Sequence, residues 1–145
     1  MPGVERSADA QWHGSLKEGK GKINAASGVL KDVPYTFGTR FEQSPGTNPE
    51  ELIAAAHAAC FSMALANNLS KKEYQVHSIK THAVVSMADA KITKIRLETR
   101  GQVDEISAES FKTMADETGR TCPVSVALSA VPIEVDAKLE TGAKS

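Results

Sequence analysis

The sequence predicts an α+β fold in which helices pack on antiparallel β-sheet. Three observations support this: one long apolar helical segment at residues 47–69, apolar-polar alternation in the segments on both sides of it, and short links between those segments. The expected order is strand-strand-strand-helix-strand-strand-helix-strand (βββαββαβ). We expect a single domain of 145 residues, with loose ends at 1–9 and 141–145.

The segment before the long helix has the pattern of three strands. We expect strands at 11–16 and 22–26 around a glycine-containing turn, and a third strand at 33–42. In this third strand the aromatic side chains would share one face, and Arg40 would lie on the other. Arginines in such positions are mostly solvated, so the default interpretation of Arg40 is a surface residue.

The long helix opens with a clear start signal. Asn48 is expected to cap it, Pro49 suits its first position, and Glu51 stands where a capping box requires a carboxylate. The rest of the helix is apolar or small on every side, which is typical of a helix that is buried all round. One sheet cannot cover all of that surface, so we expect a second copy of the chain, and hence a dimer.

The segment after the helix predicts a hairpin of strands at 76–87 and 92–103. Ser107 is then expected to cap a second helix, and Gly119 to stop it. Cys122-Pro123 has the pattern of a short helix start, with proline in the first helical position. A final strand is expected at 130–139.

Composition narrows the possible functions. A formal net charge of −1 gives no electrostatic case for nucleic acid or for an acidic membrane surface. The first residues contain no apolar signal-peptide core, so we expect a cytoplasmic protein. The apolar helix contains His57, Ser62 and two asparagines, and we interpret it as a core helix rather than a membrane span.

The two cysteines, Cys60 and Cys122, fit neither zinc-site spacing nor a CxxC motif. Their default interpretation is a pair of reduced, buried, small hydrophobic residues. Apolar neighbours alone would keep Cys60 unreactive, and the helix offers it only His57, three residues earlier. Cys122, by contrast, would benefit from its place at a helix N-terminus, which favours the thiolate. Glu50 has an adequate structural role as a first-turn carboxylate.

Several motifs together resemble one known family. NPEELIAAAHAACFSMAL around Cys60, CPVS at Cys122, and YTFGTRFE followed by GTNPEEL resemble the OsmC/Ohr family of peroxidases, and more closely its OsmC branch, named after osmotically inducible protein C. By matched position, the resemblance implies a peroxidatic thiol at Cys60 and a resolving thiol at Cys122. It also implies that Arg40 holds the thiolate and that Glu50 pairs with Arg40. The family fold is an intertwined α+β homodimer in which antiparallel sheets pack on two central helices.

The resemblance implies an antioxidant enzyme of the oxidative stress response. It would reduce organic hydroperoxides, and hydrogen peroxide more weakly, to alcohols through a Cys60 sulfenic acid and a redox-active Cys60–Cys122 disulfide. A dithiol, such as a lipoyl protein, would be the reductant, and no metal or other cofactor is implied. Two alternatives stay open: a Cys-His hydrolase using Cys60 and His57, and a non-catalytic, stress-related binding dimer.

Helix geometry adds a condition on this site. Glu50 and Cys60 are ten residues apart in one predicted helix, which corresponds to roughly 15 Å along its axis. A glutamate side chain cannot span that distance. If Arg40 and Glu50 act on a thiolate, we therefore expect it to belong to the partner chain.

Overall fold

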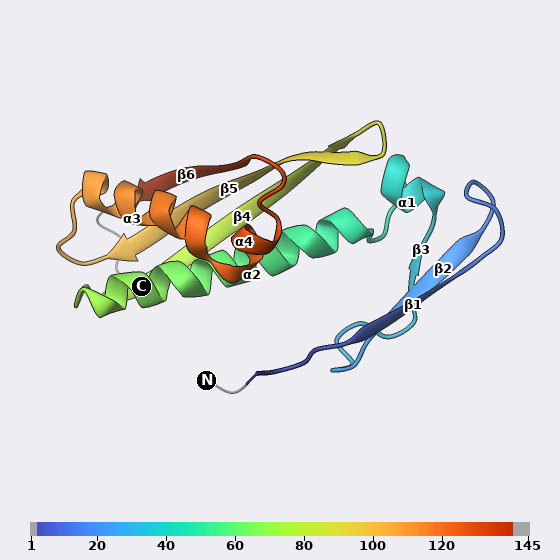
Figure 1. Ribbon diagram of the computed structural model, residues 1–145, viewed down its shortest axis with the longest axis horizontal. Helices are drawn as coiled ribbons and strands as arrows, with labels where there is room; N and C mark the ends of the chain where they lie inside the picture. The colour runs from blue at the N-terminus through green and yellow to red at the C-terminus, as the bar shows by residue number, and fades with distance from the viewer. Residues whose placement is uncertain (1–2, 141–145) are drawn as a thin grey trace. The chain divides into compact units, whose positions relative to one another are not determined.

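The computed structural model describes residues 3–140. The chain forms two compact units that divide after Leu52, and helix α2 (Pro49–Lys71) runs through the division (Figure 1). The expectation of a single domain stays a prediction. The loose end expected at 141–145 lies outside the described residues.

The first unit contains a three-stranded antiparallel sheet of order β1-β2-β3, with β1 at Ala8–His13, β2 at Lys20–Ala25 and β3 at Val33–Tyr35. The first strand starts before the predicted residue 11, so the loose end does not extend to residue 9. Its first residues pair through the backbone with the end of β2, and that pairing needs no apolar side chain, which is why the hydrophobic pattern did not indicate it.

The predicted third strand is wrong beyond Tyr35, because the chain turns there into the short helix α1 (Phe37–Phe41). The Thr36 hydroxyl accepts a hydrogen bond from the Thr39 amide (3.2 Å), and the Thr39 hydroxyl accepts one from the Thr36 amide (2.9 Å). This reciprocal capping box starts the helix. Phe37 and Phe41 are four residues apart, a spacing that places them on one face of a helix as well as on one face of a strand.

Helix α2 begins and ends close to its predicted bounds. The Asn48 side chain accepts a hydrogen bond from the Glu51 amide at 2.8 Å, which confirms the predicted cap. The Glu51 carboxylate accepts a hydrogen bond from the Thr47 hydroxyl at 2.6 Å. Residues 50 and 51 place two carboxylates in the first turn, at the positive end of the helix dipole.

Within one chain, helix α2 is not buried all round. Its buried residues, His57, Phe61, Leu65 and Leu69, form a stripe with a four-residue period. On another face Met63 is 78% exposed, with small residues beside it. By length and composition this helix could also cross a membrane, a test that core helices of soluble proteins pass as well.

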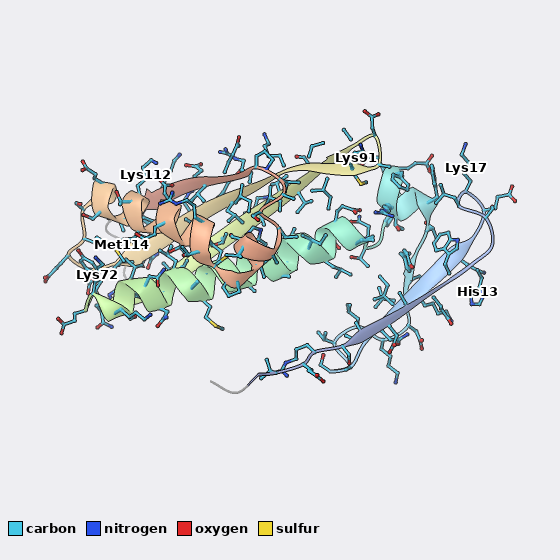
Figure 2. All side chains as sticks on the ribbon, viewed as in Figure 1. His13, Lys17, Lys72, Lys91, Lys112 and Met114 are labelled. Carbon is cyan, nitrogen blue, oxygen red and sulfur yellow. The ribbon has the colours of Figure 1, made fainter. Side chains whose placement is uncertain are left out.

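The second unit contains a sheet of order β4-β5-β6, with β4 at Val76–Ala88, β5 at Lys91–Val103 and β6 at Ile133–Leu139. The predicted hairpin of β4 and β5 is confirmed, and Lys91 follows its tip (Figure 2). Strand β6 runs parallel to β5, so the expectation of purely antiparallel sheets is wrong for this pair. The connection between them is helical, and such a crossover returns the chain in its original direction.

Two helices make that crossover, α3 at Ala108–Thr121 and α4 at Pro123–Ala127. Ser107 caps α3 as predicted, because its side chain accepts a hydrogen bond from the Ser110 amide at 3.0 Å. Gly119 does not stop this helix, which continues for two more residues. A Cβ on Gly119 would lie 2.5 Å from a methyl group of Val135, so glycine permits the close approach of α3 to β6.

The core of the second unit lies between α2, α3 and the sheet. Figure 1 shows α2 and α3 alongside the β4–β5–β6 sheet. Alternate residues of β5 point into this core, as the sequence pattern predicts. The fully buried side chains of this unit include two phenylalanines, several aliphatic residues and a small polar group: Phe61, Phe111, Leu65, Leu69, Ile95, Leu97, His57, Cys122 and Ser125. The polar members of that set lead to the candidate site.

Candidate active site

In the first unit, Arg40 and Glu50 form a two-pronged ion pair. Arg40 Nε donates to Glu50 Oε1 at 3.1 Å, and Arg40 Nη2 donates to Glu50 Oε2 at 3.0 Å. The Glu50 side chain is 10% exposed, while the Arg40 side chain is 38% exposed. The carboxylate therefore fixes the plane of the guanidinium and leaves part of it accessible to another group.

Helix α1 places Arg40 among aromatic rings. The predicted strand would instead have placed it on the opposite face from them. The guanidinium carbon of Arg40 lies 5.2 Å from the centre of the Phe41 ring. The same arginine lines a cleft of about 210 Å³ whose other walls are mostly apolar: Trp12, Leu16, Tyr35, Thr36, Phe37 and Phe41. The Arg40 guanidinium, fixed by Glu50, therefore lines an apolar cleft. The strand prediction did not indicate this arrangement.

In the second unit, Cys60 and Cys122 are both free thiols and are neighbours. Cys60 is partly buried on α2, and Cys122 is 2% exposed at the start of α4. Cys122 lies close enough to Cys60 to influence the ionisation of its thiol. Two residues that are 62 positions apart in the sequence are thus brought together by the packing of α2 against α4.

The surroundings of Cys60 raise the pKa of its thiol. Burial is the largest cause, a hydrogen bond from the Val124 backbone N–H acts in the opposite direction, and neighbouring Cys122 raises the pKa further. Among the described residues, the groups that act on this thiol include no cation. A reactive Cys60 thiolate therefore requires a positive group from outside this environment.

His57 does not pair with Cys60. Its Nε2 lies 2.7 Å from the hydroxyl oxygen of Ser125, and the Cys122 thiol donates to that same oxygen at 3.0 Å. Burial lowers the pKa of His57. Ser125 was missed in the sequence analysis, although its position three residues after Cys122 places the two side chains on one face of a helical turn. The Cys60–His57 hydrolase alternative finds no support in these contacts.

Comparison with known proteins identifies the family. The model of the "OsmC-like protein" family matches residues 41–136. Peroxiredoxin OsmC of Escherichia coli is 44% identical over 142 residues, which are 95% of this chain and 99% of the relative. The chain belongs to the OsmC family. A further relative in the OsmC/Ohr group, the organic hydroperoxide resistance protein OhrB of Bacillus subtilis, is 30% identical over 122 residues, 83% of this chain and 88% of that protein.

Solved structures confirm the OsmC fold. The crystal structure of an OsmC-like protein from Mycoplasma pneumoniae superposes with a TM-score of 0.69 at 15% identity, covering 94% of this chain and 97% of that one. The crystal structure of B. subtilis OhrB gives a TM-score of 0.63 at 23% identity, covering 92% and 98%. The predicted α+β class and the resemblance to the OsmC/Ohr family are both confirmed.

The four predicted site residues of this OsmC family member thus form two pairs. Arg40 with Glu50 is one pair in the first unit, and Cys60 with Cys122 is the other pair in the second unit. The first pair holds a cation without a nucleophile, and the second holds two thiols without a cation beside them among the described residues. Within residues 3–140, no three His, Cys, Asp or Glu side chains gather in a way that could hold a metal ion.

Proposed function

We propose that this protein is a cysteine-based peroxidase that reduces organic hydroperoxides to alcohols, and hydrogen peroxide more weakly. The observation that carries the proposal is the contact between two free thiols, Cys60 and Cys122, in a member of the OsmC family. Relatives named peroxiredoxin OsmC and organic hydroperoxide resistance protein support the same chemistry. We expect this reaction to take place in the cytoplasm.

In the first step, the Cys60 thiolate attacks the distal oxygen of the hydroperoxide. Arg40 favours the thiolate by charge-assisted hydrogen bonds and stabilises negative charge on the leaving oxygen. Glu50 keeps the guanidinium oriented through its two hydrogen bonds. The O–O bond breaks, Cys60 keeps the OH group as a sulfenic acid, and the departing alkoxide takes a proton from solvent to leave as an alcohol.

In the second step, Cys122 attacks the sulfenic sulfur of Cys60, a disulfide forms, and water leaves. A thiol reductant, either a small dithiol or a lipoyl protein, then reopens the disulfide. The apolar cleft beside Arg40 supports an organic substrate, because its aromatic walls can bury an alkyl or aryl group while the guanidinium faces the peroxide oxygens.

Mass spectrometry after one equivalent of cumene hydroperoxide tests this function. The chain with both cysteines should lose the mass of two hydrogens as the Cys60–Cys122 disulfide forms. Cys122→Ser should instead stop after one turnover, with Cys60 held as a sulfenic acid that dimedone traps. A protein in which neither thiol reacts would be a non-catalytic binding dimer. Equal multiple turnover by Cys122→Ser with a dithiol would leave Cys122 without its resolving role.

We further propose that the protein is a homodimer in which Arg40 and Glu50 of one chain serve Cys60 of the other. The face of α2 that carries exposed Met63 supports a covering second chain. Helix α2 is continuous from Pro49 to Lys71, so Glu50 and its own Cys60 are separated by about 15 Å along the helix axis. Sedimentation equilibrium should give a dimer, and a stable 15 kDa monomer would contradict it.

Mixed dimers test the exchange of residues between chains. Arg40→Ala and Cys60→Ser chains carrying different tags are co-expressed, and the dimers holding both tags are purified. If Arg40 acts across the dimer, the Cys60 of one chain meets the Arg40 of the other, and each mixed dimer recovers about half of the wild-type activity. If Arg40 acts within its own chain, no complete site exists, and the mixed dimer is as inactive as its parents.

A further inference from the structure

Cys122 donates its thiol hydrogen into a buried chain of polar groups that the two-thiol mechanism does not use. Its sulfur lies 3.0 Å from the Ser125 hydroxyl oxygen, which lies 2.7 Å from His57 Nε2. The exposed fractions are 2% for Cys122, 1% for Ser125 and 0% for His57. These three groups come from α2 and α4 and meet inside the core of the second unit.

The directions of these hydrogen bonds favour one arrangement of protons. Because Cys122 donates to the Ser125 oxygen, the serine hydroxyl can donate its own hydrogen to the Nε2 of a neutral imidazole. Every polar atom along that line is then satisfied. The other ring nitrogen, Nδ1, is buried with no hydrogen-bond partner among the described residues. A neutral ring is also what burial favours here, since it lowers the pKa of His57.

The resolving step needs a proton acceptor at this place. A thiolate, and not a thiol, attacks sulfur, so Cys122 must lose its proton before or during its attack on Cys60. At 2% exposure its thiol has little access to bulk water. The hydrogen bond to Ser125 leads directly from the Cys122 sulfur to the imidazole.

We propose that His57, acting through Ser125, is the proton acceptor for Cys122 in disulfide formation. This inference deepens the proposed peroxidase function and rests on it. Cys122 gives its proton to the Ser125 oxygen as the serine gives its own proton to His57 Nε2. The Cys122 sulfur bonds to the Cys60 sulfur, the S–OH bond breaks, and the departing hydroxide takes a proton from solvent to become water. His57 then releases the proton that it accepted, which returns the relay to its neutral form. One thiol and one sulfenic acid thus give one disulfide and one water.

The relay separates the two chemical steps of the peroxidase. Oxidation of Cys60 by hydroperoxide does not involve the Cys122 proton, whereas disulfide closure does. A group that only supports the fold would affect both steps or neither. A group that accepts the Cys122 proton affects closure selectively, by about 10²-fold or more, as general-base catalysis typically does.

The test is rapid mixing with one equivalent of cumene hydroperoxide, in which Cys60 oxidation and disulfide closure are timed separately by quenching and mass spectrometry. His57→Gln keeps an amide near Ser125 but cannot act as the base, and Ser125→Ala interrupts the relay. Both should slow closure by about 10²-fold or more, while Cys60 oxidation changes by less than about threefold. Ser125→Thr, which restores a hydroxyl, should recover most of the closure rate.

Thr99→Val is the matched control, because it removes a fully buried hydroxyl of the same unit that bonds Thr81 and a backbone carbonyl but neither thiol. It should leave both rates near those of the wild type. Closure at the wild-type rate in His57→Gln and Ser125→Ala would overturn the relay alone. Equal slowing of both steps, shared by Thr99→Val, would also overturn it. A wild-type Cys60 that is never oxidised would instead overturn the proposed function itself.

Discussion

Replacing Cys60 with serine is expected to abolish hydroperoxide turnover, lowering kcat/KM by on the order of 10³-fold or more, to the uncatalysed rate. A serine hydroxyl has nearly the shape of the thiol but is a far weaker nucleophile near neutral pH, and it does not form an equivalent of the sulfenic acid. The measurement is consumption of cumene hydroperoxide with excess dithiol. Full activity in Cys60→Ser would refute the assignment of the nucleophile.

Cys122→Ser is the matched control for this loss. It removes the thiol that neighbours Cys60, yet it leaves the first chemical step in place. The Cys122→Ser protein should consume one equivalent of hydroperoxide per chain, whereas Cys60→Ser should consume none above background. If both variants consumed one equivalent, either thiol could begin the reaction, and the distinction between the two cysteines would disappear.

The elements that could be predicted best were those whose sequence carries both an apolar pattern and a terminal signal. Helix α2 has its asparagine cap and a long apolar segment, and β5 alternates over its 13 residues. The strand predicted at 36–41 was wrong because aromatic residues four positions apart share one face in a helix as well as in a strand. The feature that decides for a helix is the capping box between two threonines. The direction of β6 follows from the helical crossover, which strand patterns alone do not encode.

The candidate site also has a part that the sequence could indicate and a part that it could not. Motif resemblance indicated Cys60, Cys122, Arg40 and Glu50, and the structure adds that they form two pairs of neighbours. The sequence could not indicate the aromatic cleft, because its walls come from β1, β3 and α1, with α1 predicted as strand. The partner of His57 was hidden for a related reason: Ser125 is 68 residues away, and only the packing of α4 on α2 brings the two together.

Arg40→Ala is expected to move the reactivity of Cys60 to higher pH. The surroundings of Cys60 in its own unit raise the pKa of the thiol, with burial as the main cause, and the groups acting on it include no cation. A guanidinium at hydrogen-bonding distance lowers the pKa of such a group by about 1 to 3. Without the guanidinium, the pKa of the Cys60 thiol rises, and the thiolate fraction at pH 7 falls about tenfold for each pH unit by which that pKa rises. Peroxidase activity should therefore fall by about 10- to 1,000-fold.

The rate of Cys60 alkylation by iodoacetamide as a function of pH measures this shift directly, and Cys122→Ser serves as the background so that one thiol is followed. Arg96→Ala is the matched control, because Arg96 also binds carboxylates and is similarly exposed, at 40%, but its partners Glu98 and Asp136 lie on strands β5 and β6. It should leave the profile unchanged. An unshifted profile in Arg40→Ala would mean that another group stabilises the thiolate.

Variants of the ion pair distinguish charge from orientation. Arg40→Lys keeps the positive charge but loses the planar fork that matches the two oxygens of Glu50, and Glu50→Gln keeps the shape of the partner but loses its charge. If charge alone activates Cys60, Arg40→Lys should have an alkylation profile close to that of the wild type. If the fork must be held in place, both variants should lie between wild type and Arg40→Ala. We expect the second result, because the Glu50 carboxylate is largely buried and makes both of its bonds to Arg40, which fixes the direction in which the guanidinium can meet a thiolate.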